Sequence, residues 1–207
     1  MSDEIGKRKY ELKSRADGMA ATRRRIAAAA VELHETIGPA RTTVSAVAGR
    51  AGVQRHTVYR HFPTDEDLFH ACSAHFRSLH PAPDPEAWAE IPKPRRRLEV
   101  ALDQLYRHYE GAAAMLTNIE RDADLVDAIQ PALRPYRTRM ARSAEVLAAG
   151  WPARGSRRRV TRAAVAHVVD FRTWSSLVQA GGMTRGQAIE LAVAMVEAAA
   201  ARPSAAR

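Results

Sequence analysis

The sequence predicts an all-α protein in which a small N-terminal three-helix domain is followed by a larger helical body, with about nine helices in all. Apolar residues recur at helical spacing in segment after segment, and no stretch shows the apolar-polar alternation of a half-buried strand. Five prolines lie between His80 and Pro94, which excludes a continuous helix there and marks a connection. A chain of 207 residues is long enough to bury such a core.

The first 20 residues mix charges with Gly6 and Gly18 and show no sustained periodicity, so we expect residues 1–20 to form a mobile basic tail. Order is expected to begin near Thr22. From there apolar residues recur at spacings of four, three and four, which predicts a first helix that ends at Gly38-Pro39. The residues of this apolar face are Ile26, Ala30, Leu33 and Ile37.

Two short helices are predicted next. Thr43 can cap the first of them, and Gly52 can end it in a left-handed conformation. The second starts at Val53 and is closed by Pro63. Two short helices separated by so tight a turn have the build of a helix-turn-helix, whose second helix lies in the major groove of DNA. We place this DNA-binding domain at residues 21–66.

Residues 67–207 are expected to form the helical body. Thr64 and Asp67 resemble a capping box for a helix that buries Leu68, Phe69, Cys72, Phe76 and Leu79. The last two helices are predicted to be the longest pair. One carries an apolar face from Val160 to Val178, and the other begins at a capping box formed by Thr184 and Gln187.

The charge of the chain is unevenly distributed. The formal net charge is +9, and residues 1–63 carry 12 basic and 6 acidic side chains, against 20 and 17 in residues 64–207. A basic N-terminal third followed by a nearly balanced body favours a polyanionic partner such as nucleic acid.

The third predicted helix leaves a polar face that is rich in hydrogen-bond donors and lacks acids. If Val53, Val58 and Phe62 face inward, the remaining side chains lie largely outside. Arginine can donate to guanine or phosphate, glutamine can pair with adenine, and hydroxyl groups can reach phosphate oxygens. The candidate DNA-binding residues on this helix and at the start of the preceding one are Thr42, Thr43, Gln54, Arg55, His56, Thr57, Tyr59, Arg60 and His61.

The segment TTVSAVAGRAGVQRHTVYRHFPTDEDLFHAC (Thr42 to Cys72) closely resembles the signature of the tetracycline-repressor (TetR) family, and TRRRIAAAAVELHETIG before it resembles that family's first helix. The resemblance is specific over residues 22–76 and architectural beyond them. It implies phosphate contacts at Thr43, Tyr59 and His61, and variable base readout at Arg55, His56 and Arg60.

One departure from the family pattern concerns the residues after Pro63. The family often has a lysine there, whereas this chain has Thr64-Asp65-Glu66, which puts that phosphate contact in doubt. The arginines at 23–25 can offset the loss, because the first helix starts near the DNA backbone in family members. We therefore add Arg23 and Arg24 to the candidate DNA-binding residues.

For the body, the resemblance implies a small-molecule effector bound between the middle helices and a homodimer formed through the last two helices. The partners expected are a palindromic double-stranded DNA operator and an effector of unknown identity. Ligand pockets are mainly apolar with a few polar groups. The candidates that fit this description are Tyr106, Tyr109, Met115, Asn118, Ile119, Tyr136, Met140, His167, Phe171 and Trp174.

The sequence supports three other functions less well. An enzyme could use the acidic run Glu120 to Asp127, but no catalytic or metal-binding motif accompanies it. A non-specific architectural DNA-binding protein without an effector is the main alternative. A membrane-surface role for the tail is disfavoured, because its apolar residues line no face.

The single cysteine, Cys72, excludes an internal disulfide and a cysteine-based zinc site. The N-terminus has no apolar stretch as long as that of a signal peptide, and no apolar stretch elsewhere is long enough to span a membrane. The prediction is a cytoplasmic regulator, released from its operator by a small molecule, that is not an enzyme and has no cofactor or metal.

Overall fold

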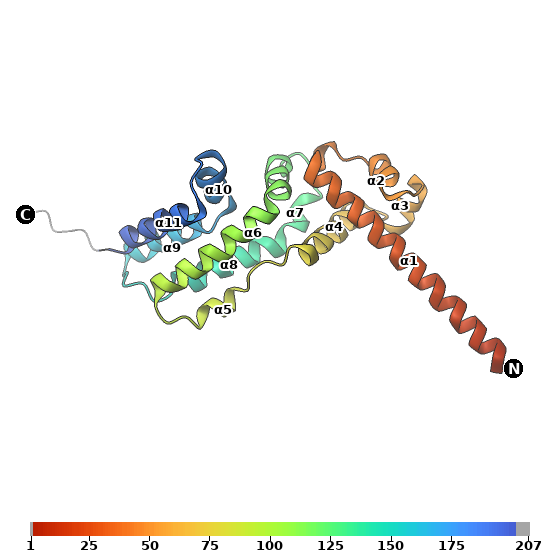
Figure 1. Ribbon diagram of the computed structural model, residues 1–207, viewed down its shortest axis with the longest axis horizontal. Coiled ribbons are helices and arrows are strands. Elements are labelled where there is room, and N and C mark those ends of the chain that lie inside the picture. The colour runs from red at the N-terminus through yellow and green to blue at the C-terminus, as the bar shows by residue number, and fades with distance from the viewer. Residues whose placement is uncertain (1, 202–207) are drawn as a thin grey trace, which may run out of the picture. The chain divides into compact units, whose positions relative to one another are not determined.

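The computed structural model describes residues 2–201, with side chains from Arg15 onward, and over that range it contains helices and no strands (Figure 1). The all-helical class and the N-terminal helix-turn-helix are confirmed. The described residues form eleven α-helices, more than the nine expected, because short helices at Pro85–Ala89 and Ile129–Ala132 were not expected and the helix predicted from Val160 to Val178 is divided. The chain splits into two compact units, which are described separately.

The first unit comprises the residues up to Leu79 together with Thr117–Ala132. It contains α1 (Ser2–Thr36), the 3-10 turn η1 (Pro39–Arg41), α2 (Val44–Ala51), α3 (Arg55–His61), α4 (Asp65–Leu79) and α7 (Ile129–Ala132). The predicted functional boundaries at residues 20 and 66 stay predictions.

The second unit comprises His80–Leu116 and the residues from Leu133 onward. It contains α5 (Pro85–Ala89), α8 (Arg134–Ala148), α9 (Ser156–Val168), α10 (Phe171–Trp174), the π-helical segment η2 (Ser175–Ala180) and α11 (Arg185–Ala200). The long helix α6 (Pro94–Asp122) gives its first part to this unit and its last turns to the first unit.

Helix α1 begins at Ser2, so the expectation that order begins near Thr22 is wrong. No proline precedes Pro39, and a glycine inside a helix costs only about 1 kcal/mol, so Gly6 and Gly18 do not interrupt the helix. The mobility of residues 1–20 stays a prediction. The predicted end is correct, because α1 stops at Thr36 and Gly38 follows with a φ of 87°.

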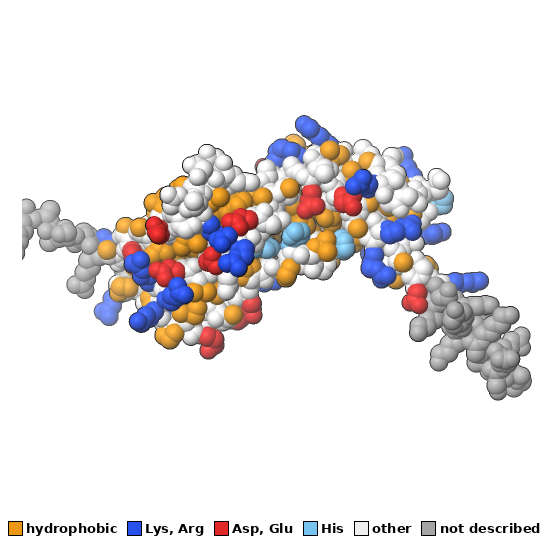
Figure 2. Space-filling model, in the orientation of Figure 1, with side chains coloured by type: hydrophobic (Ala, Val, Ile, Leu, Met, Phe, Trp, Pro, Cys, Tyr) orange, Lys and Arg blue, Asp and Glu red, His pale blue; other side chains and the backbone are white. Residues whose placement is uncertain are grey.

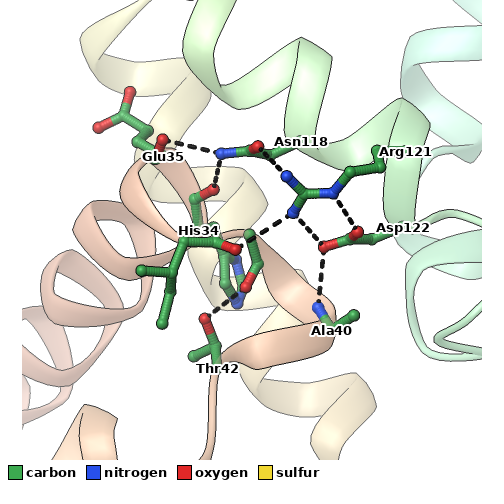
Figure 3. Close-up of polar contacts among 9 residues, drawn as sticks. His34, Glu35, Ala40, Thr42, Asn118, Arg121 and Asp122 are labelled. Atoms are coloured by element: carbon green, nitrogen blue, oxygen red, sulfur yellow. Dashed lines mark hydrogen bonds and ion pairs between the residues drawn. The ribbon is translucent and has the colours of Figure 1, made fainter.

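The carbonyl groups at the end of α1 are held by the last turns of α6 (Figure 3). The amide nitrogen of Asn118 donates to the carbonyls of His34 at 2.9 Å and Glu35 at 2.8 Å. Arg121 donates to the carbonyl of Ile37 at 3.1 Å, and it pairs with the neighbouring carboxylate of Asp122 at 2.7 Å. These bonds satisfy carbonyls that have no partner within the helix.

The buried face of α1 packs against α2 and α4. Ile26 and Ala30 have no exposed surface, and the ring of His34 stacks on Phe69 of α4 with centroids 4.9 Å apart. The Sγ atom of Cys72 lies 3.3 Å from Nδ1 of His34. Burial lowers the pKa of His34 to about 4 and raises the pKa of Cys72 to about 12, so the pair is neutral at pH 7.

The predicted helix from Val160 to Val178 is broken in the structure, which corrects that expectation. α9 ends at Val168, and Asp170 starts α10 by accepting a hydrogen bond from the backbone nitrogen of Arg172 at 2.8 Å. The break frees backbone carbonyls, and Tyr106 and Tyr109 of α6 donate to two of them. These are the carbonyls of Val168, at 2.9 Å, and Val169, at 2.6 Å.

Other expectations also need correction. Leu79 is 57% exposed at the end of α4, although Leu68, Phe69 and Cys72 are buried as predicted. The proline-rich connection includes the short helix α5, whose Trp88 is buried. The longest helices are α1, of 35 residues, and α6, of 29, instead of the last two. Both predicted capping boxes are present, at Thr64 with Asp67 and at Thr184 with Gln187.

We predict that Gly38→Ala lowers the free energy of unfolding by about 2–4 kcal/mol, measured by urea denaturation. A Cβ atom at this position would overlap the side chains of Arg121 and Asp122, and the positive φ is itself unfavourable for alanine. The matched control is Gly49→Ala inside α2, where a Cβ meets open space, and it should raise the free energy by about 0.5–1 kcal/mol. Wild-type stability in Gly38→Ala would contradict the close approach.

We also predict that stability falls with acidification because of His34. The unfolded chain protonates this histidine below about pH 6.5, whereas the buried side chain resists protonation until about pH 4. The stabilisation is therefore complete above pH 6.5 and is lost as the pH falls towards 4, by up to about 3 kcal/mol. His34→Phe should flatten the difference between urea denaturation at pH 7 and pH 4.5. The control variant His70→Gln, at an exposed position, should keep the difference in stability between pH 7 and pH 4.5. An equal pH dependence in both variants would refute the assignment of this difference to His34.

Candidate nucleic-acid interface

The outer face of α3 is made of polar side chains, as the sequence predicts. Val58 and Phe62 are 1% and 2% exposed and fix the helix to the core. Gln54 precedes the helix as its N-cap residue. The exposed side chains are those of Gln54, Arg55, His56, Tyr59 and Arg60, while Thr57 is half-buried.

Helical geometry orders this face around His56. With 3.6 residues per turn, Arg55 and Tyr59 lie on one side of His56, and Thr57 and Arg60 lie on the other. The guanidinium of Arg55 donates to the hydroxyl of Tyr59 at 3.1 Å, which orients both side chains. His56 therefore occupies the outermost position of the helix.

His61 does not lie outside, and that expectation is wrong. Its side chain is only 8% exposed, because it follows Val58 by three residues and so turns to the same buried face. Burial, together with the charges of Arg60 and Arg23, lowers the pKa of His61. The phosphate contact implied for His61 by the family resemblance stays a prediction.

Arg23 ties α1 to the end of α3. Its guanidinium lies 4.1 Å above the ring of Phe62 and donates to the backbone carbonyl of His61. Such a cation-π contact contributes about 0.5–1 kcal/mol at an exposed site. Arg23 therefore positions the recognition helix, while Arg24 is exposed next to it, and DNA contacts by either arginine stay predictions.

The start of α2 presents two threonines. The hydroxyl oxygen of Thr43 accepts a hydrogen bond from the backbone nitrogen of Ala46 at 3.1 Å, so its own hydrogen can be donated elsewhere. Thr42 donates its hydroxyl hydrogen to the carbonyl of Gly38 at 2.8 Å. Thr43 is thus the better placed of the two to donate to a phosphate.

The charge around the helix-turn-helix is mainly basic. Figure 2 shows Lys and Arg side chains around this part, whereas acidic and basic side chains stand side by side on the face of α6 and α11. There Arg185 pairs with Asp103 at 3.1 Å and with Glu110 at 2.7 Å. Helices α2 and α3 contain no acidic residue.

The ligand candidates separate between the two units. Tyr106, Tyr109, Phe171 and Trp174 are buried in the second unit, where the ring of Tyr109 lies 5.5 Å from that of Phe171. Met140 is half-buried beside them, with its sulfur 3.8 Å from the Tyr109 hydroxyl. The remaining candidates in this unit are Met115, which is buried, Tyr136, which is half-buried, and His167, which is exposed.

Asn118 and Ile119 lie in the first unit, apart from the aromatic group. The amide of Asn118 is occupied by the end of α1, so sequence reasoning missed its positioning role. That reasoning named Arg25 only as part of the arginine cluster at 23–25, whereas in the structure Arg25 lines a cleft beside α3 together with Thr22. The spacing of three residues between Thr22 and Arg25 places them on one helical face and was the available signal.

Within the described residues, no helix is long and apolar enough to cross a membrane. Residues 26–72 match the sequence family described as bacterial regulatory proteins, tetR family. This range includes all of α2 and α3, together with the end of α1 and the start of α4. No curated protein matches the chain.

Three solved structures share the fold. A HlyIIR mutant protein with a GSSGSSG linker substitution has 13% identity and a TM-score of 0.60, over 90% of this chain and 99% of that chain. A putative TetR-family transcriptional regulator from Mesorhizobium loti MAFF303099 has 20% identity and a TM-score of 0.59, over 87% of this chain and 96% of that chain. A TetR transcription regulator from Haloarcula marismortui ATCC 43049 has 18% identity and a TM-score of 0.55, over 87% of this chain and 97% of that chain.

The chain has the fold of a DNA-binding transcriptional regulator, with a helix-turn-helix and a larger helical part. The helix-turn-helix segment of the chain, residues 26–72, is that of the tetR family of bacterial regulatory proteins. Regulators of that family are generally non-enzymatic proteins that bind DNA operators as homodimers.

Proposed function

We propose that the protein is a sequence-specific repressor whose dimer leaves its operator when a small molecule binds. The observation that carries the proposal is the outer face of α3, which presents donors on both sides of His56 and no acid. Arg55 and His56 read base edges in the major groove, while Tyr59, Thr43 and Arg60 bind phosphates. Arg24, Thr42, Gln54 and Thr57 complete the proposed surface.

Dimerisation through α9 and α11 is the second part of the proposal. These two helices pack together, and both leave large apolar side chains in solvent. Val160 of α9 is 54% exposed, and Leu191 and Met195 of α11 are 40% and 37% exposed. Burying these groups against a second copy is favourable, and a two-fold axis gives two recognition helices for a palindrome.

The operator itself provides the test. DNA selected from a random pool should contain a two-fold symmetric site whose half-sites lie about 10 base pairs apart, or a multiple of that distance. At physiological salt the selected site should bind at least about 1,000-fold more tightly than random DNA. A ratio near one would contradict the proposal and favour a non-specific architectural protein, and a consensus without two-fold symmetry would contradict the dimer.

The effector is proposed to bind at the aromatic group of the second unit. The indole nitrogen of Trp174 is buried and has no hydrogen-bond partner among the described residues, and the same holds for the hydroxyl of Ser143. A buried donor without a partner costs about 1–3 kcal/mol, so these groups favour a ligand that carries an acceptor. The surrounding rings of Tyr109 and Phe171 favour an apolar, flat molecule.

Helix α6 is the element through which a bound ligand would affect DNA binding. It contributes Tyr106 and Tyr109 to the aromatic group, and it continues to Asn118 and Arg121, which hold the end of α1. A ligand that displaces α6 would therefore shift α1, and with it the Arg23 contact to α3. A shift of α4, the helix that follows the helix-turn-helix, would also move the recognition helix. Either shift changes the spacing of the recognition helices.

We predict that Trp174→Phe keeps operator binding and needs at least about tenfold more effector for release, because it removes one hydrogen bond. The effector is first identified by screening metabolites for release of the selected DNA. The matched control is Trp151→Phe, whose indole nitrogen already donates to the carbonyl of Leu147 at 2.9 Å. Equal effector concentrations for the Trp174 variant and the wild type would contradict this site. A screen in which no compound releases the DNA would contradict the effector model.

A further inference from the structure

A cleft lies between α1 and the helix-turn-helix, within the first unit. It has a volume of about 380 Å³ and is open to solvent. Helix α1 contributes Thr22 and Arg25, the turn between α2 and α3 contributes Gly52, and the α3 segment contributes Gln54, Thr57 and Arg60. None of the residues that line it is acidic.

The two arginines of this cleft are available for a ligand. Neither Arg25 nor Arg60 has a hydrogen bond or an ion pair within the described residues, and both are exposed. Nearby arginines differ in this respect, because Arg23 is bound to the end of α3 and Arg50 is paired with Glu32. Two unpaired guanidinium groups, one from α1 and one from α3, line the same cleft and create a local excess of positive charge.

The cleft continues the outer face of α3. Gln54, Thr57 and Arg60 follow one another at intervals of three residues, so they form the side of the helix that faces α1. His56 and the Arg55 and Tyr59 pair lie further round the same helix. When α3 enters the major groove, the cleft is therefore on the flank where a DNA backbone passes.

We propose that this cleft holds one phosphate of the DNA backbone between Arg25 and Arg60. A guanidinium group binds a phosphate through two parallel hydrogen bonds, and the amide of Gln54 adds a further donor. The absence of acidic residues and the open mouth suit a strand that passes through the cleft. Two arginines from different helices then grip one phosphate and fix the angle of α3 in the groove.

This inference rests on the proposed function, since it requires α3 to be the recognition helix. It assigns the phosphate contact of α1 to Arg25, on the face of the helix that lines the cleft. Because a phosphate carries no sequence information, Arg25 should govern affinity and salt dependence while leaving the preferred sequence unchanged. The contact also compensates for the lysine that this chain lacks after Pro63, where it has Thr64-Asp65-Glu66.

The test measures how the affinity for the selected operator depends on salt. Each phosphate neutralised contributes about 0.9 to the slope of log K against log salt, so Arg25→Gln should reduce the slope by about two for a dimer. Arg60→Gln should give a similar reduction. Because the two arginines share one phosphate, the loss of affinity in the double variant should differ by about twofold or more from the product of the single losses.

Two further arginines serve as comparisons. Arg77→Gln removes the same charge from the exposed side of α4 and should leave the slope unchanged. Arg24→Gln removes one positive charge from the same turn of α1, outside the cleft. It should reduce the slope by less than half as much as Arg25→Gln does. Equal reductions for Arg24→Gln and Arg25→Gln, or multiplicative losses for Arg25 and Arg60, would overturn the proposal.

Two controls separate this outcome from other failures. The thermal unfolding midpoints of the variants should match the wild type, because neither arginine has a partner in the fold. Selectivity for the operator over random DNA should persist in Arg25→Gln. If the wild type itself lacks selectivity, the proposed function fails. If the wild type is selective and Arg25→Gln keeps the full salt slope, the phosphate cleft alone is refuted.

Discussion

The arrangement of the DNA-binding part depends on how the carbonyl end of α1 is satisfied. A helix end leaves carbonyls without partners, and here the side chains of Asn118 and Arg121 supply the missing donors. Gly38 permits this approach, because any Cβ there would overlap the Arg121 guanidinium. Fixing this end fixes the whole of α1, including Ile26 in the core and Arg23 against Phe62. The recognition helix therefore takes its position from contacts made several turns away.

The second unit also contains backbone carbonyls that side chains from α6 must satisfy, and here the donors are tyrosine hydroxyls. Its helix break at Val168 to Asp170 would leave carbonyls unpaired in an apolar core, and the two tyrosines of α6 satisfy them. Their phenols are thereby committed to the fold, and the buried indole nitrogen of Trp174 is left as a free donor. The same helix, α6, supplies Asn118 in its last turns. One helix thus satisfies freed carbonyls in both units.

The sequence was sufficient where local chemistry decides the structure. The cap at Thr43, the turn at Gly52 and the apolar spacing of α3 predicted the helix-turn-helix and most of its exposed face. It was insufficient where distant groups decide. The break after Val168 has only a weak local signal, the helix-capping residue Asp170, because the compensating hydroxyls come from α6. His61 was misassigned because a polar residue was assumed to face solvent. The use of Asn118 and the presence of Arg25 and Arg60 in one cleft likewise depend on segments far apart in the chain.

The central claim is that the outer face of α3, centred on His56, reads the DNA sequence. The most direct measurement is to repeat the selection from random DNA with His56→Ala and to compare the consensus with that of the wild type. We expect relaxed preference at the same base pairs in both half-sites, with the rest of the site unchanged, at a cost of about 1–3 kcal/mol per base pair. An identical consensus for the variant and the wild type would contradict it.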